Sequence, residues 1–306
     1  MSSPGRVGSR TVWPELPYSA WKETLATLHM NLQIVGKVRL ALSPLEPQWA
    51  NVPLYLSSRG MTTTPMTYDG LIFEIVVDLI DHQVAIQTVR GETRRVALAA
   101  RAVAEFYADF MSNLKALGID AKFRPIPDEV TDPIPFARDT VHRAYEPEWA
   151  NRFWRVLSQV DLVLKEHRSR YRGRTSPVHF FWGTFDLALT RFSGRPAQPP
   201  PDAGIIRRVS ADAEQICAGF WPGNEHYPRA AFFAYTYPKP EGIEEHAIEP
   251  AQASWSAGLG EFALPYDDVR VSASPRHAIL QFFESTYAAG ARLRGWDPGL
   301  LIERAP

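Results

Sequence analysis

Residues 176–195 have the sequence SPVHFFWGTFDLALTRFSGR, which mixes bulky apolar side chains closely with chemically reactive ones. Side chains alternate between the two faces of a β-strand, so a single strand here would sort these residues into two sets. One set is typical of a core and comprises His179, Phe181, Gly183, Phe185, Leu187 and Leu189. The other mixes an indole, hydroxyls and a carboxylate and comprises Phe180, Trp182, Thr184, Asp186, Ala188 and Thr190. Such a mixed face is typical of a small-molecule pocket.

The composition of the chain is that of a globular protein without a global charge bias. It has 306 residues, of which 45% are hydrophobic and 22% charged, and its formal net charge is −1. A chain of this length can bury a substantial core in one large domain or two ordinary ones. The absence of a basic field argues against nonspecific nucleic-acid binding. Cys217 is the only cysteine, which excludes an intrachain disulfide and a thiolate zinc cluster.

Nothing in the sequence indicates a membrane segment or a secretory signal. The longest apolar runs fall well short of the roughly 20 residues that span a bilayer, and the first residues, MSSPGRVGSRTVWPELP, lack an apolar centre. We therefore expect no membrane partner and a cytoplasmic location. Residues 1–12 are small and polar, and we expect them to form a disordered leader.

Helical and strand periods alternate along the rest of the chain. Residues 19–28 suit a short helix, and from His29 to Leu42 the apolar residues alternate as in a half-buried strand. Strands follow at 71–80 and 83–89. A stripe at three- and four-residue spacing predicts a helix from Val103 that ends at Gly118.

The second part of the chain has a comparable order. A proline-rich connector, 119–146, leads to a long helix over 147–171, the strand 176–195, further strands at 230–237 and 255–264, and a last helix from Ser274. We therefore predict an α+β protein of two similar halves, 13–118 and 147–306, each an antiparallel β-sheet flanked by helices and packed as one compact body. The shared element order, a helix, a strand that starts at a histidine, more strands and a closing helix, favours an internal duplication.

Two residues of the opening stretch are candidates for catalysis. His179 is either a hydrogen-bonded residue at a strand end or a general acid or base, since imidazole titrates near neutrality. Asp186 lies in an apolar strand, where an unpaired carboxylate is costly. It is therefore either part of a structural salt bridge, with Lys37, Arg39 or Arg191 as the partner, or a carboxylate of a pocket.

Other residues are candidates for ligand binding. Lys37 shares its predicted strand face with His29, Asn31, Gln33 and Arg39, a set of directional donors that can bind a carboxylate or phosphate if the face is covered, and that is otherwise merely solvated. The aromatic residues are mostly expected in the core, with Trp221, in the predicted Gly219–Gly223 turn, and Tyr235 at a pocket rim. The full predicted ligand-binding set is Lys37, Asn31, Trp182, Thr184, Arg191, Trp221 and Tyr235, with Glu261 and Tyr266 as weaker candidates.

Several segments resemble one uncharacterised family. These are QIVGKVRLAL, VPLYLSSRGMTT, SPVHFFWGTFDLALTRFSGRP, GFWPG and GEFALPY. They are similar to a bacterial domain of unknown function (number 5996), over nearly all of the chain after about Trp13. The resemblance implies one self-contained, bacterial unit. It implies no activity, cofactor or catalytic residue.

Two classes of function remain open at this stage. The first is a cofactor-independent acid–base enzyme acting on a small anionic substrate, with His179 and Asp186 transferring protons and Lys37 and Arg191 holding the anionic group. The second is a noncatalytic ligand-binding or protein-interaction module. No phosphate loop, dinucleotide fingerprint or zinc-binding spacing occurs, so we expect neither a cofactor nor a bound metal. His179 and Asp186 fall on opposite faces of the predicted strand unless a bulge at Gly183 rotates it.

Overall fold

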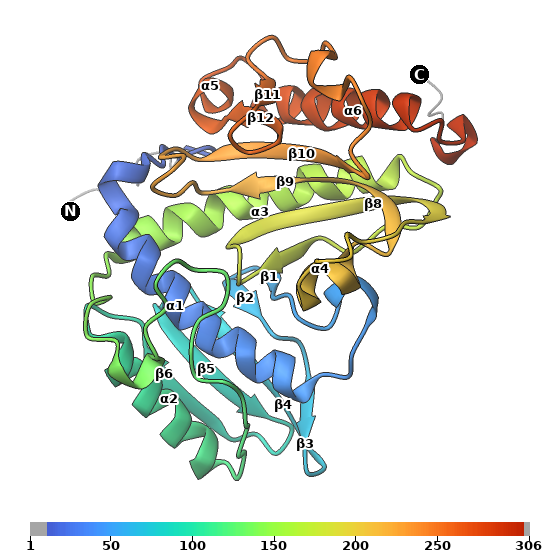
Figure 1. Ribbon diagram of the computed structural model, residues 1–306. Coiled ribbons are helices and arrows are strands. Elements are labelled where there is room, and N and C mark those ends of the chain that lie inside the picture. Colours follow the sequence, from blue (N-terminus) through green and yellow to red (C-terminus); the bar gives the residue numbers. More distant parts are fainter. Residues whose placement is uncertain (1–10, 303–306) are drawn as a thin grey trace, which may run out of the picture.

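The computed structural model describes residues 11–302 and folds them into two antiparallel β-sheets covered by α-helices (Figure 1). The predicted α+β class and the two antiparallel sheets are confirmed. The predicted leader, residues 1–12, lies outside the described residues except for Thr11 and Val12. Within 11–302, none of the helices has the length and apolar character needed to cross a membrane.

The first half begins with helix α1 (Tyr18–Leu42) and ends with α2 (Val103–Ala116). Between them lie β1 (Tyr55–Ser57), β2 (Gly60–Thr62), β3 (Met66–Tyr68), β4 (Leu71–Asp78), β5 (Gln83–Thr88) and β6 (Thr93–Ala97). The sheet has the order β1-β2-β4-β5-β6, with β3 paired to β4. Helix α2 buries the predicted apolar stripe, including Phe106 and Phe110. The connector 119–146 follows; its one helical element is the 3₁₀ helix η2 (Phe136–Arg138), and it contains no strand.

The second half begins with α3 (Pro147–Ser169) and ends with α6 (Pro275–Leu293). Its strands are β7 (His179–Phe181), β8 (Asp186–Pro196), β9 (Ala213–Trp221), β10 (Ala231–Tyr237), β11 (Ser254–Ser256) and β12 (Glu261–Pro265). They lie in the order β11-β12-β10-β9-β8-β7. Two short helices, α4 (Ile205–Ser210) and α5 (Tyr266–Arg270), interrupt the strands. Both halves therefore place six strands between two long helices, an order that is compatible with the predicted duplication.

The strand predicted from His29 to Leu42 is wrong, because α1 continues without a break through this segment. The helix packs against α2, α3 and β3, and its apolar side chains are buried around most of its circumference. Leu32, Ile34 and Val35 have no exposed surface although they point in different directions from the helix axis. In a helix that is apolar on nearly all sides, the hydrophobic residues show no clear helical period. The β-branched residues in such a segment then favour the prediction of a strand.

The single strand predicted over 176–195 is also wrong, because β7 and β8 form a hairpin with the turn 182–185 between them. Phe185 ends this turn with φ of +63°, a conformation that residues other than glycine rarely adopt. Its buried ring stacks on Phe153 of α3, with 5.4 Å between the centroids. Packing in the core thus stabilises this positive-φ conformation at position 185, where the sequence has no glycine.

The two faces of the second sheet have different surroundings. Phe180 of β7 contacts Phe153 of α3, and Phe232 of β10 contacts Phe283 of α6, so these helices cover one face. The opposite face carries Asp186, Ala188 and Thr190 of β8. Strand β9 reaches Trp221, so the predicted Gly219–Gly223 turn begins later than expected. The uncovered face is where the candidate site lies.

Candidate functional site

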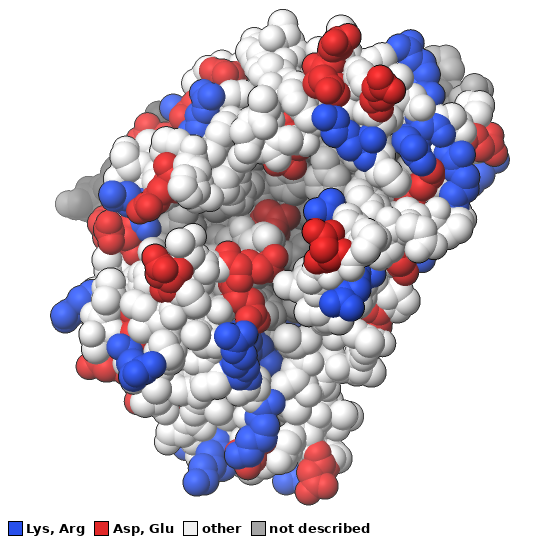
Figure 2. All heavy atoms as spheres, viewed as in Figure 1, with Lys and Arg blue, Asp and Glu red and all other residues white. Residues whose placement is uncertain are grey.

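The uncovered face of the second sheet is the floor of a cavity of about 920 Å³. It is seen in Figure 2 as a deep hollow with acidic side chains at its floor and lower rim. Both halves of the chain contribute walls, which include the 3₁₀ helix η1 (Pro47–Trp49), Asp128 and Glu129 of the connector, and Ile205 and Ile206 of α4. A cavity of this size is typical of small-molecule sites.

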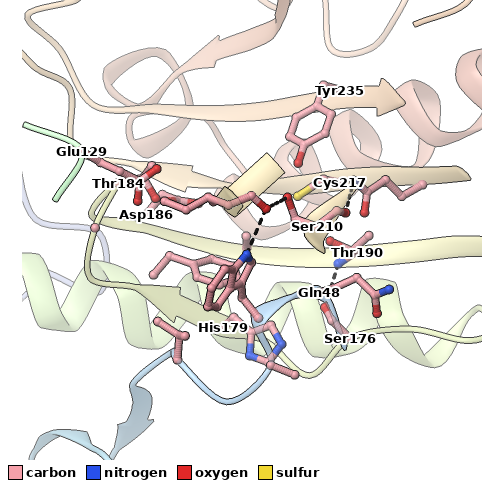
Figure 3. Close-up of a pocket in the computed structure, with 18 of the residues that line it drawn as sticks. Gln48, Glu129, Ser176, His179, Thr184, Asp186, Thr190, Ser210, Cys217 and Tyr235 are labelled. Atoms are coloured by element: carbon pink, nitrogen blue, oxygen red, sulfur yellow. Dashed lines mark hydrogen bonds between the residues drawn. The ribbon is translucent and has the colours of Figure 1, made fainter. Parts of the chain in front are cut away.

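Strand register explains which side chains meet on the floor. Thr190, Cys217 and Tyr235 are direct partners across β8, β9 and β10, so they lie side by side. On β7 and β8, Phe181 pairs with Asp186 and His179 pairs with Ala188. His179 and Asp186 are therefore diagonal neighbours on one face, and the hairpin turn, instead of a bulge at Gly183, brings them there. Figure 3 shows His179, Asp186, Thr190, Cys217 and Tyr235 around the same space.

The hairpin turn presents Asp186 together with two polar neighbours. The Thr184 hydroxyl donates a hydrogen bond to Oδ1 of Asp186. Glu129 comes from the connector and lies against Gly183, where a Cβ atom would stand 2.2 Å from Oε2 of Glu129. Any residue larger than glycine at 183 would displace this carboxyl. Gly183 thus allows Glu129 to reach the cavity beside Asp186.

Three carboxyl groups of the cavity have raised pKa values. Burial, with repulsion from Glu129, raises the pKa of Asp186 to about 7, although the hydrogen bond from Thr184 opposes the shift. Burial, with repulsion from Asp186, raises the pKa of Glu261 to about 7. Burial and the charge of Asp128 raise the pKa of Glu129. No cation of residues 11–302 contributes to these three shifts.

The other titratable groups on the floor are neutral near pH 7. Burial raises the pKa of the Cys217 thiol to about 12, so it is not an activated nucleophile. The neighbouring Cys217 and burial raise the pKa of Tyr235. Burial, followed by the charge of Arg39, lowers the pKa of His179 to about 4. His179 is 3% exposed, and its Nδ1 has no hydrogen-bond partner among residues 11–302.

Polar side chains along one face of α1 bond to the hairpin turn and to the connector, and thereby link both to the first half. His29, Gln33 and Lys37 are four residues apart and thus share one helix face. Nε2 of His29 lies 3.0 Å from both the Trp182 and Gly183 carbonyl oxygens. Gln33 exchanges two hydrogen bonds with the Asp128 backbone, at 2.7 and 3.1 Å. Nζ of Lys37 lies 2.6 Å from Oδ2 of Asp128. The polar residues that suggested a binding face therefore position the site's walls.

The structure brings six of the nine predicted site residues to the cavity. They are His179, Trp182, Thr184, Asp186, Trp221 and Tyr235. The Trp182 indole forms part of the wall, since its N–H donates to the Val52 carbonyl at 2.9 Å. Its ring also packs where a side chain on Gly36 would have to lie.

Three predicted ligand-binding residues do not line the cavity. Lys37 is buried and paired with Asp128 instead of Asp186. Asn31 is buried within α1, and its Oδ1 has no hydrogen-bond partner in the described part of the chain. Arg191 lies on the opposite face of β8 and pairs with Glu284 of α6, with 3.2 Å between Nη2 and Oε1. The wrong prediction of a strand at 29–42 misplaced Lys37 and Asn31. The position of Arg191, in contrast, agrees with the alternation of side chains along β8.

Some cavity residues were not singled out from the sequence. Glu129 lies in a connector without a periodic pattern, and Trp49 in a short 3₁₀ helix, so neither had a signal that could place it. Cys217 could have been found, because strand alternation puts it on the same face as Trp221. The weaker candidate Glu261 lines the cavity. Tyr266 is buried elsewhere and donates to the Pro14 carbonyl at 2.7 Å. Residues 11–302 contain no group of three or more His, Cys, Asp or Glu arranged to hold a metal ion.

Comparison with known proteins identifies the family but no function. Residues 13–302 match the model of the family of unknown function DUF5996, so the chain belongs to that family. No curated protein and no solved structure gives a significant match.

Proposed function

We propose that the protein binds a small, partly apolar organic molecule in this cavity and that Asp186 exchanges a proton with it. The observation that carries the proposal is the position of Asp186, whose pKa is raised to about 7, on the floor of a cavity large enough for such a molecule. A general acid or base works best when its pKa is near the operating pH. Perturbed carboxyl groups in a cleft are therefore candidates for catalysis.

Acid–base chemistry suits this site better than covalent catalysis. Glu261 has a similarly raised pKa and interacts with Asp186, so one carboxyl can donate a proton while the other accepts one. Cys217 is protonated and buried, and His179 is neutral, which leaves no activated nucleophile on the floor. The noncatalytic alternative is a binding protein in which the same carboxyls only recognise the ligand.

The charge of the ligand differs from the expectation drawn from the sequence. An anionic substrate was expected because Lys37 and Arg191 were available to hold it. These side chains are paired with Asp128 and Glu284, so they do not serve this purpose. The carboxyls that surround the cavity favour a ligand without negative charge.

The experiment combines metabolite profiling with a blocked cavity. A mixture of cellular metabolites is incubated with the wild-type protein, with Asp186→Asn and with Thr190→Phe, which fills the centre of the floor. Thr67→Phe, at an exposed position of β3, is the matched control. We expect mass spectrometry to show metabolites that the wild type and Thr67→Phe bind or convert and that Thr190→Phe does not. Conversion should be slowed at least about tenfold by Asp186→Asn.

Two results would count against this proposal. Equal retention of metabolites by the wild type and a folded Thr190→Phe variant would show that the cavity is not the binding site. Retention without any conversion, or conversion that is unchanged in Asp186→Asn, would leave a binding protein and remove the catalytic role of Asp186.

A further inference from the structure

The charged groups around Asp186 in the cavity are carboxyls from the connector and from β12. Glu129 and Asp128 lie on the connector and Glu261 on β12. The titratable neighbours on the floor are His179 on β7, Cys217 on β9 and Tyr235 on β10, all neutral near pH 7. The cavity therefore contains an excess of carboxyl groups on its floor and inner wall.

The cations near the cavity do not neutralise these carboxyls. Arg174 lies at the margin, is exposed, and has its guanidinium carbon 4.1 Å from the centre of the Phe192 ring. Lys37 pairs with Asp128, the one carboxyl of the group with a buried cationic partner. Within residues 11–302, Asp186, Glu129 and Glu261 thus have no cationic partner, and a bound cation would oppose the burial and the repulsion that raise their pKa values.

His179 is an independent indication of a ligand. It lines the cavity, is 3% exposed, and its Nδ1 has no hydrogen-bond partner in the described chain. Buried polar atoms are nearly always paired, so an orphaned ring nitrogen in a cavity wall indicates a group that binds there. Because Asp186 and His179 are diagonal neighbours, a single small molecule can reach both.

Part of the wall is aromatic. It includes Trp49, Phe181 and Phe233, which can surround a ligand body and whose ring faces attract a positive charge. Gly219 contributes to this shape, because a Cβ atom there would stand 2.5 Å from Cζ of Phe233. The Phe233 ring therefore lies over Gly219 of β9.

We infer that the ligand is an organic cation, such as an ammonium group on an apolar body, whose charge is held by Asp186, Glu129 and Glu261 while His179 hydrogen-bonds its polar end. This inference rests on the proposed function and narrows its ligand class. It adds that charge recognition in the cavity depends on carboxyls, irrespective of whether a reaction follows.

The test uses three probes of similar size and different charge: benzyltrimethylammonium, benzyl alcohol and phenylacetate. The first has no titratable proton, so its charge is constant with pH. Binding is measured by isothermal titration calorimetry at pH 8 to the wild type, Asp186→Asn and Glu261→Gln. Asp120→Asn is the control, because Asp120 is an exposed carboxyl outside the cavity.

We expect the ammonium probe to bind the wild type at least about tenfold more tightly than phenylacetate, and about tenfold more tightly than it binds either cavity variant. Benzyl alcohol should bind all four proteins within about twofold. Affinity for the ammonium probe should rise between pH 6 and pH 8, because the carboxyl of Asp186 loses its proton over this range.

The possible failures are distinguishable. If no probe binds to the wild type, the proposed function itself fails. If the probes bind, but phenylacetate or benzyl alcohol binds as tightly as the ammonium, the cavity does not select cations and this inference alone is overturned. A preference for the ammonium probe that is unchanged in both cavity variants would also overturn it, because the charge would then be recognised elsewhere.

Discussion

Asp186 and Arg191 lie on opposite faces of β8, and their surroundings differ. Arg191, on the core face, is fully buried, pairs with Glu284, and donates a hydrogen bond to the His167 carbonyl. Its guanidinium carbon also lies 4.5 Å from the centre of the Tyr287 ring. Asp186, on the cavity face, has a hydroxyl donor, Thr184, and carboxyl neighbours, but no cation of the described residues 11–302 acts on it.

The pKa values of Glu284, the partner of Arg191, and of Asp186 reflect this difference in surroundings. Burial alone would raise the pKa of Glu284, but the hydrogen bond from His167 and the charge of Arg191 outweigh it and lower the pKa to about 2. For Asp186, burial and Glu129 together raise the pKa to about 7. A counter-charge offsets the cost of burying a charge, whereas a buried charge without one lowers the stability. Arg191 and Glu284 thus form a structural pair, whereas the proposed function gives Asp186 a role in the site.

Removal of the compensated carboxyl should have the largest effect. Glu284→Gln leaves the Arg191 guanidinium buried without its counter-charge, and breaking a buried pair in this way typically costs about 3–5 kcal/mol. Because the Glu284 side chain is 25% exposed, we expect a loss of about 3 kcal/mol in the free energy of unfolding by urea at pH 7. A loss below about 1 kcal/mol would show that Arg191 does not depend on this partner.

An intermediate loss is expected for Asp128→Asn. Nζ of Lys37 is bonded to Asp128, and the Lys37 side chain is only 4% exposed. The variant should lose about 2 kcal/mol of unfolding free energy, measured in the same way. It should also loosen residues 125–132, seen as faster amide hydrogen exchange in this segment. Unchanged exchange would indicate that the connector is held without this ion pair.

Replacement of the uncompensated carboxyl should have the opposite sign. Asp186 has a folded pKa of about 7 against an ordinary value of 3.8, so the native state binds more protons than the unfolded state between these values. Its contribution to stability therefore falls as pH rises from about 4 to 7 and is constant above 7. Asp186→Asn should stabilise the protein by about 1–2 kcal/mol at pH 8, because Asp186 is only half-buried and solvent screens part of the cost. The gain should be smaller at pH 5.

Measurement of unfolding at both pH values tests this sign. A variant that is less stable than the wild type at pH 8 would show that Asp186 has a stabilising partner. In that case the contrast between the two faces of β8 would not hold.

The smallest effect is expected for an exposed pair that belongs to neither face. Nζ of Lys122 lies 2.7 Å from Oδ1 of Asp120, and their side chains are 81% and 59% exposed. Exposed pairs contribute little, so Asp120→Asn should change the unfolding free energy by less than about 0.5 kcal/mol. A larger change would mean that ion pairing in this protein cannot be ranked by burial.

Local patterns in the sequence predict which side chains of β8 and α2 face the core. The alternation in β8 separates Asp186 from Leu187 and Leu189 correctly, and the stripe of α2 identifies a buried helix face. The pattern fails in α1, where burial on all sides removes the period that distinguishes a helix from a strand. For this reason the sequence predicts the wrong ion-pair partner for Lys37, although it predicts correctly that several of the neighbouring residues are polar.

Contacts between residues far apart in the sequence determine the parts of the structure that local sequence patterns do not predict. The turn at Phe185 depends on stacking against Phe153, a residue more than thirty positions away in α3. Glu129 reaches the cavity because Lys37 and Gln33 hold the connector and because Gly183 leaves room for it. No spacing within the chain encodes these contacts.

The central claim is that Asp186 is an uncompensated carboxyl on the floor of a ligand cavity. The most direct measurement is an NMR titration of the aspartate side-chain carboxyl carbons in the labelled protein, with the Asp186 signal identified by its loss in Asp186→Asn. We predict an apparent pKa of about 7 for this signal, and a lower value when a bound organic cation is present. A pKa near the ordinary 3.8, unchanged by every ligand that binds, would contradict the account.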